Sequence, residues 1–177
     1  LLVYPLKKDE HETQEYIEMQ NKKTEHVLKS VEEFAKEKYN VDVFKLESPV
    51  NVNQLSDSDL SLFKEMGTLA RKPWVMLSAG AGKKEFKKVL ELAFKAGSSG
   101  FLAGRAIWLD AFNHYPDWSK IKNQLETSSR SYLSEIGSIA EKHALPWNNH
   151  NCYSTEGNQF PYQNSEFRNL YKEITLS

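Results

Sequence analysis

Residues 40–51, NVDVFKLESPVN, form an apolar run that places a lysine inside an expected strand. Val43, Phe44 and Leu46 favour a strand, and Pro49 helps to close it. A strand with one face in solvent alternates polar and apolar side chains, and this run does not, so we expect a buried strand. The cationic side chain of Lys45 in such a strand is either chemically active, or it snorkels to solvent or forms an ion pair.

The composition indicates an ordinary globular protein. The 177 residues carry 23 Lys plus Arg and 24 Asp plus Glu, for a formal net charge of -1. This balance gives no reason to expect a nucleic acid or an anionic membrane as partner. The single cysteine, Cys152, excludes an internal disulfide and is typical of the cytoplasm. No apolar run approaches the roughly 20 residues of a membrane span.

Strands and helices alternate along the chain on both sides of this run. The expected strands are at residues 1–5, 40–51, 73–80 and 100–108, and the expected helices are at 22–40, 56–70 and 83–96. Such alternation predicts parallel βα units, and four strands with three connecting helices are half of a (β/α)8 barrel. An open doubly wound sheet is the alternative, but its Gly-x-Gly-x-x-Gly signature is absent after the first strand.

The side-chain alternation of the strand at 40–51 predicts where its lysine points. Val41, Val43, Lys45 and Glu47 share one face, and Lys45 lies near the C-terminal end, which is the catalytic end of a barrel strand. An amine among apolar side chains is desolvated, and its neutral form can attack a carbonyl. Glu47 could hold Lys45 in place, contact a substrate, or serve as a plain ion-pair partner.

Two loops of small residues follow the last two expected strands. They are LSAGAG at 77–82 and AGRA at 103–106. Small residues let backbone N–H groups approach an anion, a helix start after Gly104 would add a favourable dipole, and Arg105 can clamp phosphate oxygens. Phosphate sites in barrels often use the loops after strands seven and eight. Each loop alone could also be a simple tight turn.

The remaining reactive residue types indicate neither a metal site nor a serine hydrolase. His143, His150 and Cys152 form a loose cluster without the spacing of a zinc site, and Ser78 lacks a Gly-x-Ser-x-Gly elbow. We therefore expect no metal and no other cofactor.

Three blocks of sequence resemble one family of enzymes. VDVFKLESPVN, KPWVMLSAG and AGSSGFLAGRAIW resemble the class I aldolases of the tagatose 1,6-bisphosphate aldolase family, to which the sulfofructosephosphate aldolases belong. The resemblance covers about residues 1–110. It implies an α/β fold, the (β/α)8 TIM barrel, and metal-independent cleavage of a phosphorylated ketose. It implies that Lys45 forms a Schiff base and that a phosphate is held by Ser78, Ala79, Gly80, Gly104 and Arg105. Glu47 is a further candidate substrate contact because of its place on the strand.

The resemblance also implies which part of the barrel this chain supplies. Residues 1–115 would be its C-terminal half, with the last four strands. The resemblance does not cover residues 116–177, which we expect to form a helical and loop extension packed on the barrel. The chain would begin partway through a longer protein, and the family's acid/base glutamate would stand just before Leu1. We expect a cytoplasmic homo-oligomer that cleaves tagatose or fructose 1,6-bisphosphate, or sulfofructose 1-phosphate, to dihydroxyacetone phosphate and a three-carbon aldehyde. The alternative is a non-catalytic barrel that binds sugar phosphates as a sensor or assembly module.

Overall fold

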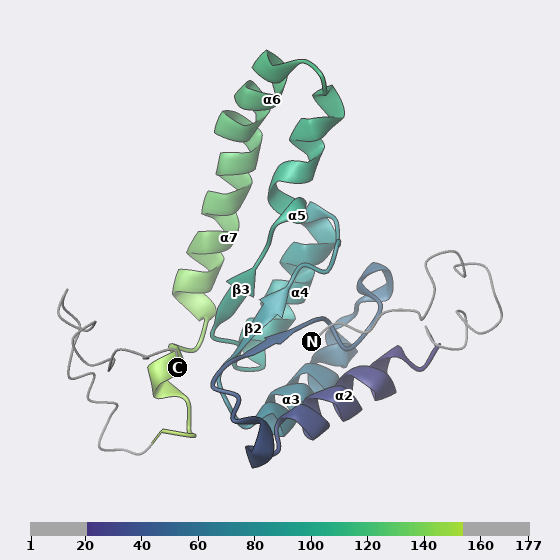
Figure 1. Ribbon diagram of the computed structural model, residues 1–177, viewed down its shortest axis with the longest axis vertical. Coiled ribbons are helices and arrows are strands. Elements are labelled where there is room, and N and C mark those ends of the chain that lie inside the picture. The colour runs from purple at the N-terminus through teal and green to yellow at the C-terminus, as the bar shows by residue number, and fades with distance from the viewer. Residues whose placement is uncertain (1–20, 154–177) are drawn as a thin grey trace, which may run out of the picture.

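The computed structural model describes residues 21–153, which fold around a three-stranded parallel sheet (Figure 1). The strands are β1 (Phe44–Leu46), β2 (Trp74–Leu77) and β3 (Gly100–Leu102), in the order β1-β2-β3. The longer helices are α2 (Lys23–Phe34), α3 (Leu60–Ala70), α4 (Lys83–Lys95), α6 (Trp118–Gln124) and α7 (Arg130–His143). Three of the four predicted strands are thus found, and the fourth, at residues 1–5, lies outside the described residues.

The register of the sheet sets which side chains share a face. Lys45 pairs with Val75, and Val75 pairs with Gly100, so these three residues form one row across the strands. The next row runs from Leu46 through Met76 to the third strand. Because facing residues of neighbouring strands point to the same side of a sheet, the two rows lie on opposite faces.

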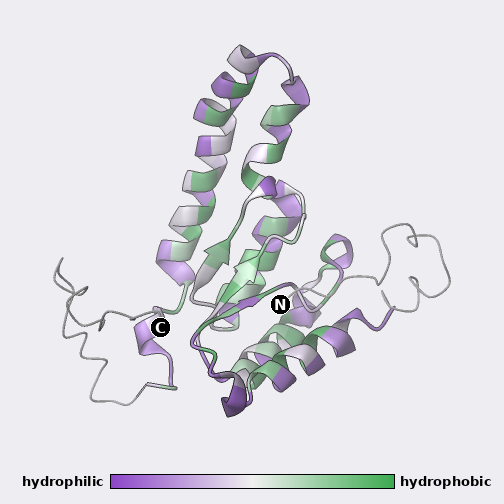
Figure 2. Ribbon diagram, in the orientation of Figure 1, coloured by the Kyte–Doolittle hydropathy of each residue, from purple (hydrophilic) through white to green (hydrophobic). Residues whose placement is uncertain are grey.

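Within residues 21–153, helices cover only one of these faces. Phe44, Leu46, Trp74 and Met76 are buried in a core formed with α2, α3 and α4, whose apolar sides are green in Figure 2. On the other face, Val43 is 51% exposed, so its predicted burial is wrong. Parallel sheets are normally covered on both faces. An α/β unit with a small parallel sheet covered on one side is consistent with part of a barrel, whose lumen would lie on the open side.

Local signals explain where the helices begin and end. The backbone N–H of Ser56 donates to Asp59 Oδ2 at 2.8 Å in a capping box just before α3. The apolar stripe of α4 is buried as its spacing predicts, and Gly97 follows that helix with φ +91°. The start of α3 and the whole of α4 were therefore predictable to within about two residues.

The chain after β3 forms a helical hairpin that projects beyond the sheet (Figure 1). It rises through α5 (Arg105–Trp108) and the 3-10 helix Leu109–His114, and returns through α6, a π-helical segment (Leu125–Ser129) and α7. The amphipathic run predicted at 119–144 is confirmed by this returning helical stretch. None of the helices within residues 21–153 has the length and apolar character needed to cross a membrane.

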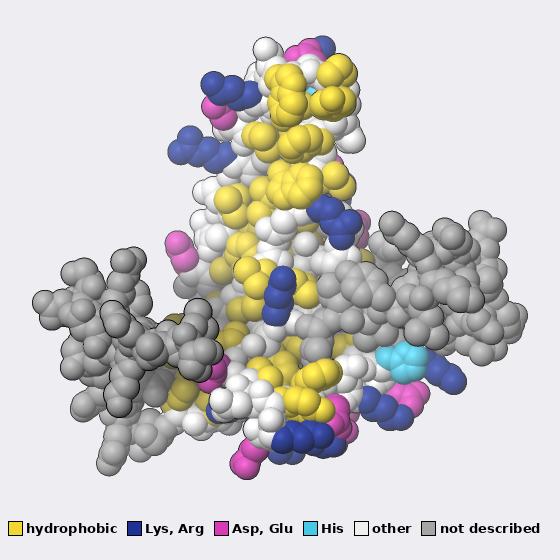
Figure 3. Space-filling view, in the orientation of Figure 1, with side chains coloured by type: hydrophobic (Ala, Val, Ile, Leu, Met, Phe, Trp, Pro, Cys, Tyr) yellow, Lys and Arg dark blue, Asp and Glu magenta, His cyan; other side chains and the backbone are white. Residues whose placement is uncertain are grey.

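The hairpin attaches to the rest of the protein through α7. Ile136 is fully buried and Tyr132 is 8% exposed, and both belong to the common core to which α4 contributes. Hydrophobic side chains also run along one face of the hairpin in Figure 3. The exposed large hydrophobic side chains of the hairpin are Trp108, Leu109, Phe112, Tyr115, Trp118 and Leu133.

Candidate active site

Lys45 stands on the open face of the sheet, at the centre of β1. Its side chain is exposed, and so is that of Val43 on the same face. The shielding predicted from Val41 and Val43 is therefore not provided by the part of the chain that the structure describes. Lys45 lies in a strand as predicted, but at its centre rather than near its C-terminal end, with its side chain on the face that the helices of residues 21–153 leave uncovered.

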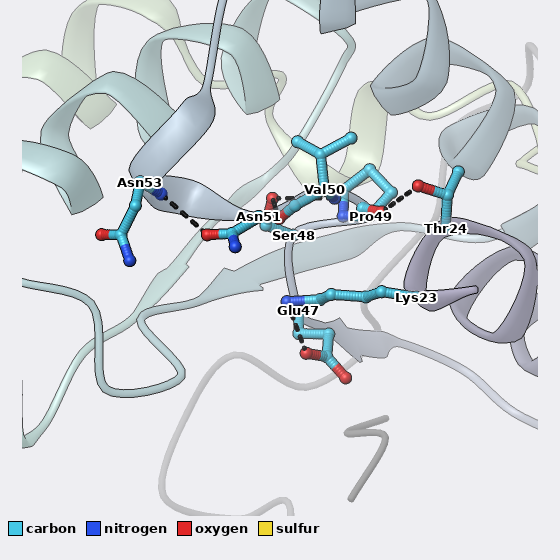
Figure 4. Close-up of polar contacts among 8 residues, drawn as sticks. All are labelled: Lys23, Thr24, Glu47, Ser48, Pro49, Val50, Asn51 and Asn53. Carbon is cyan, nitrogen blue, oxygen red and sulfur yellow. Dashed lines mark hydrogen bonds and ion pairs between the residues drawn. The ribbon is translucent and has the colours of Figure 1, made fainter. Parts of the chain in front are cut away.

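Glu47 lies beyond the end of β1, where the alternation of faces stops. It is 5% exposed, whereas Lys45 is exposed, and its Oε2 is 3.3 Å from the Nζ of Lys23 in the first turn of α2 (Figure 4). The structure thus gives Glu47 an ion pair with a helix. It does not place Glu47 among the residues that line the cavity near Arg105 described below.

The loop that follows β1 forms hydrogen bonds with the same helix and within itself (Figure 4). The hydroxyl of Thr24 donates to the carbonyl of Pro49 at 2.8 Å, next to the ion pair of Lys23. Within the loop, the Ser48 hydroxyl donates to the carbonyl of Val50 at 2.9 Å. These contacts join the C-terminal end of β1 to the start of α2.

The loop after β2 makes a tight turn with unusual backbone angles. The N–H of Ala81 donates to the carbonyl of Ser78 at 2.8 Å, and the two central residues, Ala79 and Gly80, have φ of +47° and +84°. Two positive φ values define a type I′ turn. Alanine in the left-handed region costs roughly 1–2 kcal/mol. Backbone strain of this kind clusters at ligand sites, and it motivates a functional reading of the turn.

The two small-residue loops meet at one cavity of about 150 Å³. Its lining is Gly80, Ala81, Gly82, Lys83, Arg105, Ala106, Leu109 and Asp110. The side chain of Arg105 lies over the turn, because a Cβ built on Gly80 would be 3.8 Å from its Nη2. Loops that are separated in sequence thus place a guanidinium and a glycine turn on one small cavity, as an anion site requires.

The helix dipole at this cavity comes from a different helix than predicted. The α-helix that begins at Arg105 has four residues, too few for a substantial dipole. In contrast, α4 has 13 residues and begins at Lys83, which lines the cavity. The first N–H groups of a long helix favour an anion. The start of α4 therefore supplies the helix dipole that the sequence predicted for the helix after Gly104.

Sequence reasoning missed two charged residues at this cavity. The Nζ of Lys83 is 2.9 Å from Asp110 Oδ2 and lies over the ring of Tyr132, 5.7 Å from its centroid. The place of Lys83, first in the helix after a glycine loop, is a signal that could have found it. Nothing in the sequence around Asp110 indicates that it lies at the cavity, because its distance from Lys83 depends on how the hairpin folds back.

The loose cluster of histidines and a cysteine has a simple local explanation. The Nδ1 of His150 accepts a hydrogen bond from the N–H of Cys152 at 3.2 Å. Burial, followed by the charge of Lys72, lowers the pKa of His150. Among residues 21–153, no three His, Cys, Asp or Glu side chains lie close enough to hold a metal ion.

Comparison with known proteins identifies the family to which this chain belongs. The model of the DeoC/LacD family aldolases matches residues 1–110. The chain belongs to this family. Its relatives include tagatose 1,6-diphosphate aldolase 1 of Enterococcus faecalis, 31% identical over 137 residues, and tagatose 1,6-diphosphate aldolase of Listeria monocytogenes, 31% identical over 136 residues. Tagatose 1,6-diphosphate aldolase 2 of Streptococcus agalactiae is 26% identical over 162 residues.

These matches cover most of this chain and less than half of each relative. The shares are 70% of the chain and 42% of the E. faecalis protein, 68% and 40% for L. monocytogenes, and 83% and 49% for S. agalactiae. The DeoC/LacD family has a TIM-barrel aldolase fold. The three parallel strands found here, covered on one face, are consistent with part of that barrel.

Proposed function

We propose that the chain is the C-terminal half of a class I aldolase that cleaves a phosphorylated ketose. The family and the names of its relatives support an aldolase. The observation that carries the proposal is that one sheet has both a lysine on the open face of β1 and a small cavity with a guanidinium and a glycine turn at the ends of β2 and β3. A carbonyl-attacking amine and a phosphate-binding site are the two elements that such a reaction needs.

The register of the strands supports a substrate that reaches from Lys45 to the cavity. Lys45 pairs with Val75, and Ser78 follows three residues later, where the turn of the cavity begins. Three residues of strand are about 10 Å long. The lysine side chain and the C1–O–P linkage of a ketose 1-phosphate together span a distance of this order. The phosphate in the cavity then fixes the carbonyl against the amine.

The chemistry follows from the amine. Lys45 Nζ attacks C2 of the ketose and water leaves, which forms an iminium ion. A general base takes the proton of the C4 hydroxyl. The C3–C4 bond breaks, its electron pair moves into the iminium to give an enamine, and the aldehyde departs. Protonation of C3 and addition of water release dihydroxyacetone phosphate and the free amine.

The names of the relatives favour tagatose 1,6-bisphosphate as the ketose over the sulfofructose alternative. In this proposal residues 1–115 complete the barrel with the upstream half, and residues 116–177 form an extension. The packing of α7 on α4 supports an extension that rests on the barrel. Gly80 and Arg105, which line the cavity, hold the phosphate, and Ser78, Ala79 and Gly104 shape the two loops beside it. Glu47 fixes the exit of β1.

Reductive trapping tests the proposal. The full-length protein is incubated with dihydroxyacetone phosphate and borohydride, which reduces the imine and fixes the ligand on the reacting lysine. We expect the label on Lys45, no label and no cleavage activity in Lys45→Met, and full labelling in the control Lys64→Met, which removes an exposed lysine of α3. A label on any other lysine, or activity that survives Lys45→Met, would overturn the mechanism.

A further inference from the structure

We propose that Lys83 is a second cationic ligand of the substrate phosphate and makes the site selective for a dianionic phosphoryl group. This inference rests on the proposed function, because it concerns the same anion cavity. Neither the sequence motifs nor the family match assigns a role to this lysine. Its place in the cavity beside Arg105 carries the inference.

The ammonium group of Lys83 is held near the cavity from two sides. Asp110 Oδ2 is 2.9 Å from its Nζ, and the ring centroid of Tyr132 is 5.7 Å away. A cation over an aromatic face within about 6 Å is attracted by the ring. The side chain of Lys83 is 27% exposed, so it is partly desolvated along its length. A lysine fixed in this way binds a ligand with less loss of rotamer freedom than a free surface lysine.

The backbone of Lys83 is fixed as well. The hydroxyl of Tyr132 in α7 donates to the carbonyl of Lys83 at 3.0 Å, and Tyr132 is 8% exposed. Burial, followed by the charges of Glu135 and Glu85, raises the pKa of Tyr132 to about 12, so the hydroxyl keeps its proton at neutral pH. The hairpin therefore positions the first residue of α4 at the cavity.

The lining of the cavity carries two cations and one carboxylate. The cations are Arg105 and Lys83, and the carboxylate is Asp110. The Asp110 side chain is 55% exposed, so solvent weakens its charge, and Glu85 Oε2 lies beside Gly82, where a Cβ would be 2.5 Å from it. An ammonium group has three N–H donors, so Lys83 can keep its bond to Asp110 and donate to a phosphate oxygen as well. Two cations stabilise a dianion more than a monoanion.

Calorimetric titration of the full-length protein with dihydroxyacetone phosphate tests this role. A phosphate ester loses its second proton near pH 6, so the ligand is a dianion at pH 7.5 and mostly a monoanion at pH 5. We expect Lys83→Gln to weaken binding about tenfold at pH 7.5, since a charge-assisted hydrogen bond is lost, and less at pH 5. The matched control Lys84→Gln removes the exposed neighbour, which does not line the cavity, and should bind within twofold of wild type.

Three further measurements separate the outcomes. Lys83→Arg keeps the charge and should bind dihydroxyacetone phosphate within about threefold of wild type. Thermal melting by circular dichroism shows whether each variant is folded. Uncharged dihydroxyacetone should be trapped on Lys45 equally well in wild type and Lys83→Gln. Wild-type affinity in a folded Lys83→Gln would overturn the inference and leave the proposed function standing. Failure of the wild type itself to bind the phosphate ester would overturn both.

Discussion

The hydroxyl of Tyr132 donates a hydrogen bond to the carbonyl of Lys83 at 3.0 Å across 49 residues of sequence. It joins the returning helix of the hairpin to the first turn of α4, at the edge of the anion cavity. The residues that follow the family match at 1–110 therefore contact the barrel unit at its candidate phosphate site. If the cavity binds phosphate as proposed, this contact lets the C-terminal helices position the site.

Tyr132→Phe should reduce the free energy of unfolding by about 1 kcal/mol, because a buried hydrogen bond is lost while the ring is kept. Urea denaturation followed by circular dichroism measures the change. Tyr39→Phe is the control, since the Tyr39 hydroxyl bonds to Glu33 on the surface and its loss should cost less than about 0.5 kcal/mol. Equal effects of the two substitutions would contradict the structural role of Tyr132.

The same tyrosine should give stability a dependence on alkaline pH. Its pKa is raised from 10.0 to about 12 in the folded protein, chiefly by burial. The stabilising contribution of the neutral hydroxyl is therefore complete below pH 10 and is lost as the pH rises from 10 to 12. The difference in unfolding free energy between wild type and Tyr132→Phe should shrink over this interval. A difference that stays constant from pH 9 to 12 would argue against a buried, neutral tyrosine.

Lys23→Met should destabilise the protein by about 3 kcal/mol, because it removes a cation 3.3 Å from a carboxylate that is 6% exposed. Denaturant titration measures the loss. Lys29→Met in the same helix is the matched control, since its pair with Glu25 is exposed to solvent and should contribute little to stability. Similar losses for both variants would show that the Lys23–Glu47 pair is not a buried contact.

Gly80→Ala should impair substrate binding. Its φ of +84° is costly for alanine, by roughly 1–2 kcal/mol, and the new methyl would lie 3.8 Å from Arg105 Nη2. We expect a higher KM for the ketose phosphate and a lower melting temperature. Gly137→Ala, inside α7 with no atom within 4 Å of the new methyl, should instead stabilise the protein by about 0.5–1 kcal/mol and leave KM unchanged. Unchanged KM in Gly80→Ala would remove the turn from the site.

Arg105→Ala should raise KM for a ketose phosphate at least about tenfold in the full-length enzyme, because a charge-assisted contact contributes roughly 1.5–3 kcal/mol. Steady-state kinetics gives the value. Arg130→Ala removes an exposed arginine of α7 outside the cavity and should leave KM within twofold of wild type. Equal KM values for wild type and Arg105→Ala would exclude Arg105 as a phosphate ligand.

The sequence by itself determined the order of strands and helices and the residues of the α4 core. Turn residues, capping residues and apolar spacing act over a few neighbouring positions, so they can be read without knowing the fold. The same local signals located Lys45 in a strand and put glycine-rich loops after the next two strands. The resemblance of these blocks to the aldolases also came from sequence, and the family match agrees with it.

Only the tertiary structure decided how charged side chains are paired and which face of the sheet is open. The burial of Glu47 depends on Lys23 of α2, and the place of Lys83 depends on Asp110 and Tyr132 in the hairpin. Such pairs join residues 24 to 49 positions apart, and no local pattern encodes them. Electrostatic contacts act through space, so their partners are set when the helices pack, and this packing gives Lys83 its contacts with Asp110 and Tyr132.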